Sequence, residues 1–401
     1  MTATSPVTTQ QAAAATAWLV VFGTSLAHLL NDIIQSLVTA SYPVIESEFR
    51  LTFWQIGLIT FAMQVTASIF QPIVGHLSDR HAVTHALGIG MSLSLTGLVL
   101  LAAGPGYPWL LAGATLIGLG SAIFHPEASR VARAASGGRF GTAQSLFQVG
   151  GNAGTAIGPL LAAFVVVIYG RTSLMWFTTL ALAALLILLW LGSWHARHRA
   201  AAARRPVPRR EGPALTRGTI IGALVVLALL TFSKNIYTAA VGSYYTFFLI
   251  ERFGLTAQQS QLMLFVFLGA MAAGVALGGP IGDRIGPLAV IWVSILGVLP
   301  FTLLLPFASL FWTGVLSVVI GVILASAFPA IVVYAIELVP GRVGLISGMF
   351  FGFAFGMGGI AAAVLGLLAD INGLQWVFVV CGFLPAIGIL TVFLPRRALA
   401  V

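Results

Sequence analysis

Twelve long apolar runs, separated by short polar breaks, constrain this sequence more than any other feature. An α-helix needs about 20 apolar residues to cross the hydrocarbon core of a bilayer, and each run reaches roughly that length. None of the runs alternates residue by residue, as the strands of a membrane barrel do. The sequence therefore predicts an all-α polytopic membrane protein whose twelve transmembrane helices fall near residues 17–43, 52–76, 84–103, 108–130, 141–168, 172–194, 218–250, 259–280, 287–306, 311–336, 343–369 and 374–394.

The composition excludes several other classes of protein. Hydrophobic residues make up 59% of the chain and charged residues only 7%, whereas a soluble domain averages about 25% charged residues. The formal charge of +9 comes from short loops and not from a folded basic face, so we expect no nucleic-acid partner. Cys381 is the only cysteine, and neither a metal-binding pattern nor a nucleophile–base pattern is present. We therefore expect no metal, no cofactor and no enzymatic activity.

The basic residues are unevenly divided between the two sides of the predicted membrane. Of the 19 basic residues, 15 fall on one side, 3 on the other and one within a span. The positive-inside rule then predicts that both termini are cytoplasmic. Residues 195–217 are rich in arginine and proline, and the simplest role for their charges is topogenic. The expected organisation is a disordered cytoplasmic N-terminus, a six-helix half, a basic cytoplasmic linker, a second six-helix half and a cytoplasmic tail, at 1–16, 17–194, 195–217, 218–394 and 395–401.

The two halves repeat a short loop motif. GHLSDR at 75–80 matches GPIGDR at 279–284 with a shift of 204 residues. Parallel halves of this kind are typical of transporters whose substrate site lies at the midplane between them. The pattern Gly-x-x-x-Asp-Arg after the second and eighth spans resembles the loop motif of the major facilitator superfamily. The resemblance implies two pseudo-symmetric halves and a cytoplasmic gating latch made by Asp79, Arg80, Asp283 and Arg284.

Other stretches extend this resemblance over both halves. GTAIGP at 154–159 resembles the fifth-helix motif of proton-coupled antiporters, although small residues also serve general helix packing. LAHLLNDIIQSL, FHPEASRVARAASGGRF, SYYTFFLIERFGL and SGMFFGFAFGMGGI are similar to stretches of the bacterial fosmidomycin exporters. The resemblance implies a monomeric protein of the bacterial inner membrane that exports a small anionic phosphonate antibiotic in exchange for protons. The alternative is an exporter of sugars or organic phosphates for which drug export is incidental.

A polar stripe interrupts the first apolar run. His28, Asn31, Asp32 and Gln35 fall within an arc of about 100° on a helix, so we expect them to face a cavity and not lipid. Ionising Asp32 against lipid would cost about 2.5–3.5 kcal/mol or more. We expect Asp32 to hold a proton facing one side and release it facing the other, with His28 as a relay. Asn31 and Gln35 are then candidate substrate contacts. The alternative is a structural hydrogen-bonded pair that joins two helices.

Lys234 is the only lysine in the chain, and it lies near the middle of the seventh run. The parallel repeat places the first and seventh helices opposite each other, and Lys234 shares one helical face with Tyr237 and Tyr245. A buried ammonium would suit an anionic head group such as a phosphonate. The alternative is a simple charge pair with Asp32.

The fifth and fourth runs supply further candidates. Gln144, Gln148, Asn152 and Thr155 form a polar stripe. Its amides suit a hydroxyl or hydroxamate, and hydrogen bonds between helices are an equal alternative. His125 and Glu127 are secondary candidates for the proton path. They lie about 200° apart on a helix, so both cannot face the same cavity. For Glu127, an ion pair with Arg130 is the alternative.

Overall fold

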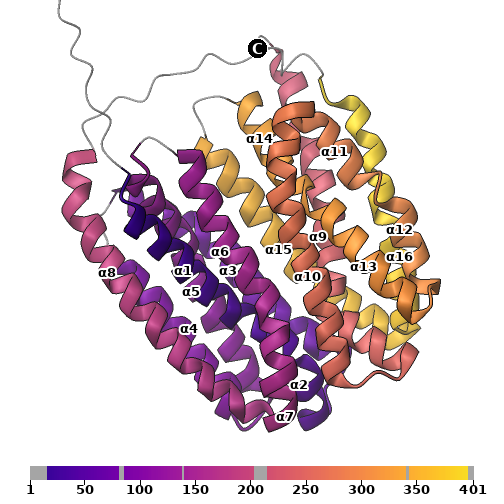
Figure 1. Cartoon of the computed structure of the whole chain (residues 1–401). Coiled ribbons are helices and arrows are strands. Elements are labelled where there is room, and N and C mark those ends of the chain that lie inside the picture. The colour runs from indigo at the N-terminus through magenta and orange to yellow at the C-terminus, as the bar shows by residue number, and fades with distance from the viewer. Residues whose placement is uncertain (1–15, 81–84, 138–139, 203–214, 340–342, 396–401) are drawn as a thin grey trace, which may run out of the picture.

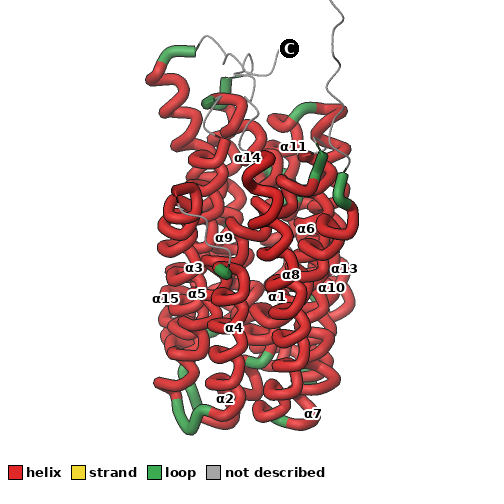
Figure 2. The backbone as a smooth tube through the Cα atoms, turned by 90° about the vertical axis from the view of Figure 1, so that its left-hand side faces the viewer, coloured by secondary structure: helices red, strands yellow, loops and turns green. Residues whose placement is uncertain are grey.

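The computed structural model describes residues 16–80, 85–137, 140–202, 215–339 and 343–395. Over these residues the chain is a bundle of helices, with no strand (Figure 2). The helices run between the two ends of the bundle, where most of the loops lie. Each of the twelve predicted apolar runs is helical, which confirms the all-α prediction.

The first six runs form elements α1 to α8, which we call the N-terminal group. Pro159 precedes a short π-helical stretch in the fifth run, and a 3-10 stretch opens the sixth. The elements are α1 (Trp18–Ala40), α2 (Tyr42–Phe49), α3 (Phe53–Arg80), α4 (Ala86–Ala103), α5 (Tyr107–Ala135), α6 (Phe140–Leu161), η1 (Ala162–Val166), α7 (Val167–Tyr169), η2 (Arg171–Phe177) and α8 (Thr178–Ala202).

The last six runs form elements α9 to η4, which we call the C-terminal group. Three of these runs contain prolines and are broken into shorter helices, because a proline removes a backbone donor. The elements are α9 (Arg217–Phe253), α10 (Ala257–Ile285), α11 (Pro287–Ile295), α12 (Leu299–Leu304), η3 (Leu305–Phe307), α13 (Leu310–Ala325), α14 (Ala327–Leu338), α15 (Val343–Asn372), α16 (Leu374–Gly382) and η4 (Leu384–Phe393).

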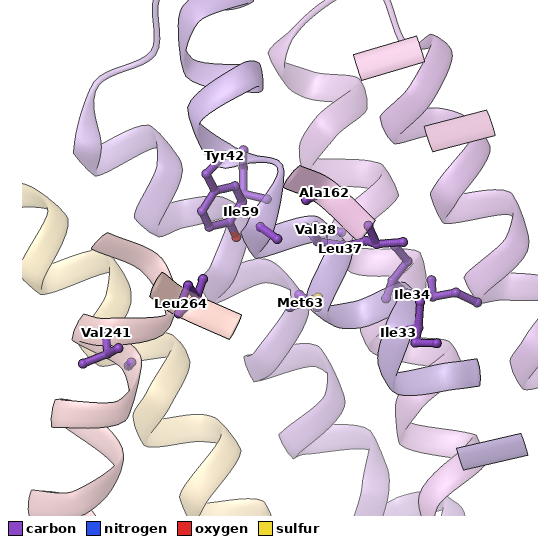
Figure 3. Packing of buried hydrophobic residues seen from close by; sticks show 14 of the residues in the cluster. Ile33, Ile34, Leu37, Val38, Tyr42, Ile59, Met63, Ala162, Val241 and Leu264 are labelled. Atoms are coloured by element: carbon purple, nitrogen blue, oxygen red, sulfur yellow. The ribbon is translucent and has the colours of Figure 1, made fainter. Parts of the chain in front are cut away.

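Eleven of the described helical segments are long and apolar enough to cross a membrane. The remaining run is α1, which is 23 residues long. Its polar stripe lowers its hydropathy. Leu19, Phe22 and Leu26 in its first half are exposed, but no side chain from Ala27 to Ala40 is, so both faces of this second part lie inside the protein. The apolar face holds Ile33, Ile34, Leu37 and Val38, which pack in one cluster with Met63 and Ala162 (Figure 3). Burial inside the bundle, and not lipid, therefore accommodates the polar residues of α1.

The N-terminal and C-terminal groups lie side by side (Figure 1). They meet along two pairs of helices, α3 with α15 and α6 with α10. The start of α1 and the end of η4 lie at the same end of the bundle, which we call the proximal end. The opposite end, where α1 leads into α2 and α3 begins, is the distal end.

The outside of the bundle is apolar, as expected of a surface that contacts lipid. Large hydrophobic side chains are strongly exposed in both groups, including Leu19, Leu186 and Phe311. In water this much exposed apolar surface would drive association.

The expected linker, residues 195–217, is partly helical. α8 continues to Ala202, and α9 begins at Arg217. Residues 203–214 and the expected N-terminal segment 1–15 lie outside the described residues.

The repeat between the halves extends to the start of two helices. The backbone N–H of Gln55 donates to Thr52 Oγ1 and that of Thr52 to Gln55 Oε1, at 3.2 and 2.9 Å. The same reciprocal pair joins Thr256 and Gln259, at 3.2 and 3.0 Å. Each is a capping box, which fixes the first turn of a helix. The two boxes lie 204 residues apart, so the loop-motif offset also sets where α3 and α10 begin.

Candidate functional site

Asp32 is the centre of a buried polar cluster between α1, α5 and α6. The amide nitrogens of Asn31 and Gln35 donate to Asp32 Oδ1 at 3.0 and 3.2 Å. The Asp32 side chain keeps 16% of its surface exposed. Two of the other three residues of the predicted stripe therefore bond the carboxylate of Asp32, which is still accessible, and the third, His28, also contacts it.

His28 contacts Asp32 through one particular nitrogen. Its Nδ1 lies 2.8 Å from the carbonyl oxygen of Phe147, and a carbonyl only accepts hydrogen bonds, so Nδ1 carries a hydrogen. Its Nε2 faces Asp32 Oδ2 at 3.4 Å. A neutral His28 would then turn a lone pair toward an ionised carboxylate. The favourable arrangement places a proton between the two groups, on Nε2 or on the carboxyl.

His125 approaches the same carboxylate from α5. Its Nδ1 lies 3.0 Å from the carbonyl oxygen of Ser121, and its Nε2 lies 3.8 Å from Asp32 Oδ1. The polar atoms of His28, Asp32 and His125 all lie within 4.8 Å of one another, close enough for a cation to be shared. The ring of His125 is 6.0 Å from that of Phe355 on α15. His125 thus connects the cluster to the C-terminal group.

α6 lies against the cluster because it presents glycines there. A Cβ on Gly151 would collide with the imidazole of His28, and one on Gly154 would collide with the backbone of Leu29. Thr155 Oγ1 donates to the carbonyl oxygen of Gly151 at 3.1 Å and lies 3.5 Å from Asp32 Oδ2. Small residues here allow close contact of two helix backbones. The GTAIGP segment therefore serves as a packing seam beside Asp32.

The polar stripe of α6 is only partly described. Gln148 and Asn152 are half-buried, and no described residue forms a hydrogen bond with either amide. The side chain of Gln144 lies outside the described residues. Because Thr155 of the same stripe reaches Asp32, this free amide surface lies next to the carboxylate cluster.

Lys234 does not form the charge pair with Asp32 that was one alternative. It lies on α9 and is 92% buried, with a relative exposure of 8%. Its Nζ lies 5.2 Å from the ring centroid of Phe328 on α14. Within the described part of the chain, no carboxylate lies within 4.0 Å of this nitrogen and no acceptor bonds it. A buried cation without a counter-charge is costly, so Lys234 stays a candidate for contact with an anionic ligand.

The two tyrosines on the Lys234 face turn into the C-terminal group. Tyr245 Oη lies 2.6 Å from Ser317 Oγ on α13. Tyr237 is 1% exposed, and its hydroxyl is buried without a hydrogen-bond partner among the described residues. The structure therefore does not bring these hydroxyls to Asp32, and their role in substrate binding stays a prediction.

The structure places none of the remaining candidates, Glu127 and the described part of the predicted latch, in the cluster around Asp32. Glu127 is buried and pairs with Arg130 at 3.2 Å, the alternative foreseen for it. Of the predicted latch, the side chains of Asp79, Arg80 and Asp283 lie outside the described residues. Arg284 is exposed near the proximal end of α10.

Sequence reasoning missed the polar residue that supports the α1–α6 seam. Pro159 has no N–H, so the carbonyl of Thr155 loses its helical donor. Ser36 Oγ donates to that carbonyl at 2.9 Å. The signal was present in the sequence, because a proline inside a predicted helix always leaves a carbonyl that needs a partner.

Comparison with known proteins decides the family. The Major Facilitator Superfamily family pattern matches residues 24–256 and 225–400. The chain belongs to the major facilitator superfamily. It is 54% identical to the fosmidomycin resistance protein of Escherichia coli (strain K12), over 92% of this chain and 91% of that protein. It is 40% identical to the uncharacterized MFS-type transporter YfnC of Bacillus subtilis (strain 168), over 94% and 92% of the two chains.

Solved structures of low identity share this fold. A mutant form of the nucleoside transporter NupG is 13% identical, with a TM-score of 0.73, and the alignment covers 93% of this chain and 98% of that chain. Membership of the major facilitator superfamily makes the protein a multi-pass membrane transporter of small molecules and not an enzyme. The buried cluster around Asp32 is then a candidate for part of its transport pathway.

Proposed function

We propose that the protein exports small organic anions of the phosphonate type, such as fosmidomycin, by alternating access in exchange for protons. Both termini would be cytoplasmic, in a bacterial inner membrane. The similarity to a fosmidomycin resistance protein over nine-tenths of both chains supports the substrate class. The excess of arginine in the loops at one side supports the orientation.

One observation carries the proton part of the proposal. The Phe147 carbonyl fixes the hydrogen on His28 Nδ1, so His28 Nε2 and Asp32 Oδ2 meet at 3.4 Å with room for a proton. Both protonation patterns, an ion pair or two neutral groups, have the same net charge. When the surroundings change from one side of the membrane to the other, the pair can release that proton and then carries a negative charge. His125 is the adjacent group that can receive the proton.

The substrate part of the proposal depends on Lys234. Its ammonium is buried near the middle of α9 with an aromatic ring as its neighbour, and no carboxylate of the described residues lies within 4.0 Å of it. A phosphonate or phosphate would supply the missing charge through charge-assisted hydrogen bonds. The unbonded amides of Gln148 and Asn152 would serve the polar remainder of the substrate.

Mutation of Asp32 tests the proton part. In inverted vesicles with an acidic lumen, the unaltered protein should accumulate labelled fosmidomycin. Asp32→Asn mimics a carboxyl that is permanently protonated, so net uptake driven by the pH gradient should fall to background. Exchange of internal for external substrate needs no net proton movement and should continue.

The pattern of losses separates coupling from structure. If Asp32 only joins α1 to its neighbours, the Asn variant should retain both activities or lose both. Asn372→Ala, at the exposed end of α15, is the matched control and should behave as the unaltered protein. Gradient-driven uptake by Asp32→Asn would overturn the assignment.

A second candidate substrate class is sugar phosphates and other organic phosphates. Lys234 favours it equally, because an ammonium recognises the charge of the head group and not the carbon skeleton. Competition in the same vesicles distinguishes the two. Inhibition by glucose phosphate or glycerol phosphate at concentrations similar to that of fosmidomycin would favour the broader class, and no inhibition would favour the phosphonate.

A further inference from the structure

The first turn of α3, at the distal end, has two backbone N–H groups that need an acceptor from outside their own helix. A helix begins with amide groups that have no partner within the helix. The capping box of Thr52 and Gln55 provides an acceptor for the amide of Gln55. The capping box provides no acceptor for the backbone amides of Phe53 and Trp54, which lie between Thr52 and Gln55 in the first turn.

Asp370 supplies the acceptor for both amides. The N–H of Phe53 donates to Asp370 Oδ1 and that of Trp54 to Asp370 Oδ2, each at 2.9 Å. Asp370 lies near the end of α15, in the C-terminal group. One carboxylate therefore caps a helix of the other group with both of its oxygens, and its charge also favours the positive end of the helix dipole.

Close packing surrounds this contact on the buried side. A Cβ on Gly57 of α3 would lie 2.8 Å from the Cα of Ala363, and one on Gly366 would collide with the carbonyl oxygen of Phe53. The hydroxyl of Tyr244 donates to the carbonyl of Ala362 at 2.5 Å and lies 3.2 Å from that of Phe53. The backbones of α3 and α15 are thus in close contact at the distal end, and the carboxylate of Asp370 lies at the exposed edge of this contact.

The start of α10, which the repeat relates to the start of α3, has no equivalent contact with a carboxylate among the described residues. α10 begins with the same type of capping box, formed by Thr256 and Gln259. Its first free amides belong to Ala257 and Gln258, and no carboxylate among the described residues accepts from them. The α10 end is held instead by Gln261, whose Nε2 donates to the carbonyl of Ala40 at 2.7 Å. Of these two helix starts, only that of α3 is capped across the groups by a carboxylate among the described residues.

We propose that Asp370 is the distal gating latch of the transport cycle. Alternating access requires the two groups to separate at the distal end, and α3 cannot leave α15 without breaking both hydrogen bonds to this carboxylate. The latch therefore stabilises the state in which the distal end is closed. It acts by positioning α3 and touches neither substrate nor proton, so it rests only on the alternating-access part of the function proposed above and not on the proposed substrate or on proton coupling.

Site-directed labelling tests the latch. Ser243 is 2% exposed and lies behind the distal contact, where its hydroxyl is 3.2 Å from that of Thr60. Ser243→Cys, in a Cys381→Ala background, gives a single thiol that a membrane-impermeant maleimide should reach from the distal side only when the gate opens. Adding Asp370→Ala should raise the labelling rate about five-fold, the factor that a typical lost N-cap produces. Asp370→Asn, which retains one acceptor oxygen, should give a smaller rise.

The matched control removes a helix cap whose two residues both belong to the C-terminal group. Gln259→Ala breaks the capping box of α10 and should leave the labelling rate unchanged. Thermal unfolding of each variant shows whether it is folded, and a folded Asp370→Ala variant with unchanged labelling would overturn the proposal. So would an equal rise in Gln259→Ala, because the effect would then come from a frayed helix. If Asp370→Ala does not fold, the Asp370→Asn variant gives the decisive comparison.

Discussion

The imidazole of His28 is held so that only one of its nitrogens is available for proton exchange. Its Nδ1 is engaged by the Phe147 carbonyl, and its ring stacks on that of Phe147 with centroids 4.0 Å apart. A backbone hydrogen bond and an aromatic stack thus choose the tautomer and the ring orientation together. His125 has the same arrangement through the Ser121 carbonyl, but its Nε2 is farther from Asp32.

The difference in distance predicts an order of importance for the two histidines. His28→Gln removes the nitrogen at 3.4 Å from the carboxylate, and His125→Gln removes the one at 3.8 Å. We expect proton-driven uptake to fall more in the His28 variant, because the closer group exchanges the proton with Asp32 directly. Uptake at a series of lumen pH values, at equal amounts of protein, measures the order. A larger loss in His125→Gln would contradict it.

Lys234 predicts opposite effects on binding and on stability. Lys234→Met keeps a long flexible side chain beside Phe328 but removes the charge. We expect the KM for the anionic substrate to rise about ten- to hundred-fold, since hydrogen bonds to charged groups contribute about 1.5–3 kcal/mol. We also expect a higher Tm, because the variant no longer buries an unpaired cation. Uptake kinetics and thermal unfolding check the two effects, and a lower Tm with unchanged KM would indicate a structural lysine.

At the scale of elements, the packing of α1 against α6 determines the shape of the cluster. The glycines of α6 allow its backbone to lie against α1, while Ser36 bonds the carbonyl that Pro159 leaves free. Asp32 and Thr155 meet only because the two helices are this close. The seam therefore holds the groups that we propose to bind the proton in place as well as joining two helices.

Two glycine substitutions of the same kind should have opposite effects. Gly154→Ala would push a methyl group into the backbone of Leu29 and toward the Cβ of Asp32. We expect it to destabilise the protein by about 1–3 kcal/mol. Gly222→Ala lies in the helix α9 with nothing within 4 Å of the new atom, and should be neutral or stabilise by up to about 1 kcal/mol. Thermal unfolding in one detergent compares them, and equal effects would show that the seam is not tightly packed.

For the whole molecule, the lengths of the apolar runs predicted the helices, because the thickness of the bilayer sets the length of each run. They could not predict contacts that depend on the angles between helices. A charge pair of Lys234 with Asp32 was one of two alternatives, yet the Lys234 side chain turns toward Phe328 in its own group. Asp370 drew no attention, since a carboxylate at a helix end is ordinary until the fold brings it to the start of α3, over 300 residues away. Contacts between the N-terminal and C-terminal groups, such as that of Asp370 with α3, thus could not be predicted from the pattern of apolar runs.

The proposed exchange also predicts how the whole transporter responds to membrane potential. Exporting a dianion and importing one proton moves three charges in the same electrical sense, worth about 7 kcal/mol per 100 mV. In inverted vesicles without a pH gradient, a lumen-positive potential set by potassium and valinomycin should therefore increase uptake of the phosphonate, and a lumen-negative potential should decrease it. Asp32→Asn, which should retain only substrate exchange, should show no net uptake in response to either the potential or the pH gradient. Uptake that is independent of potential in the unaltered protein would exclude the antiport of an anion with protons, because no whole number of imported protons makes that exchange electroneutral.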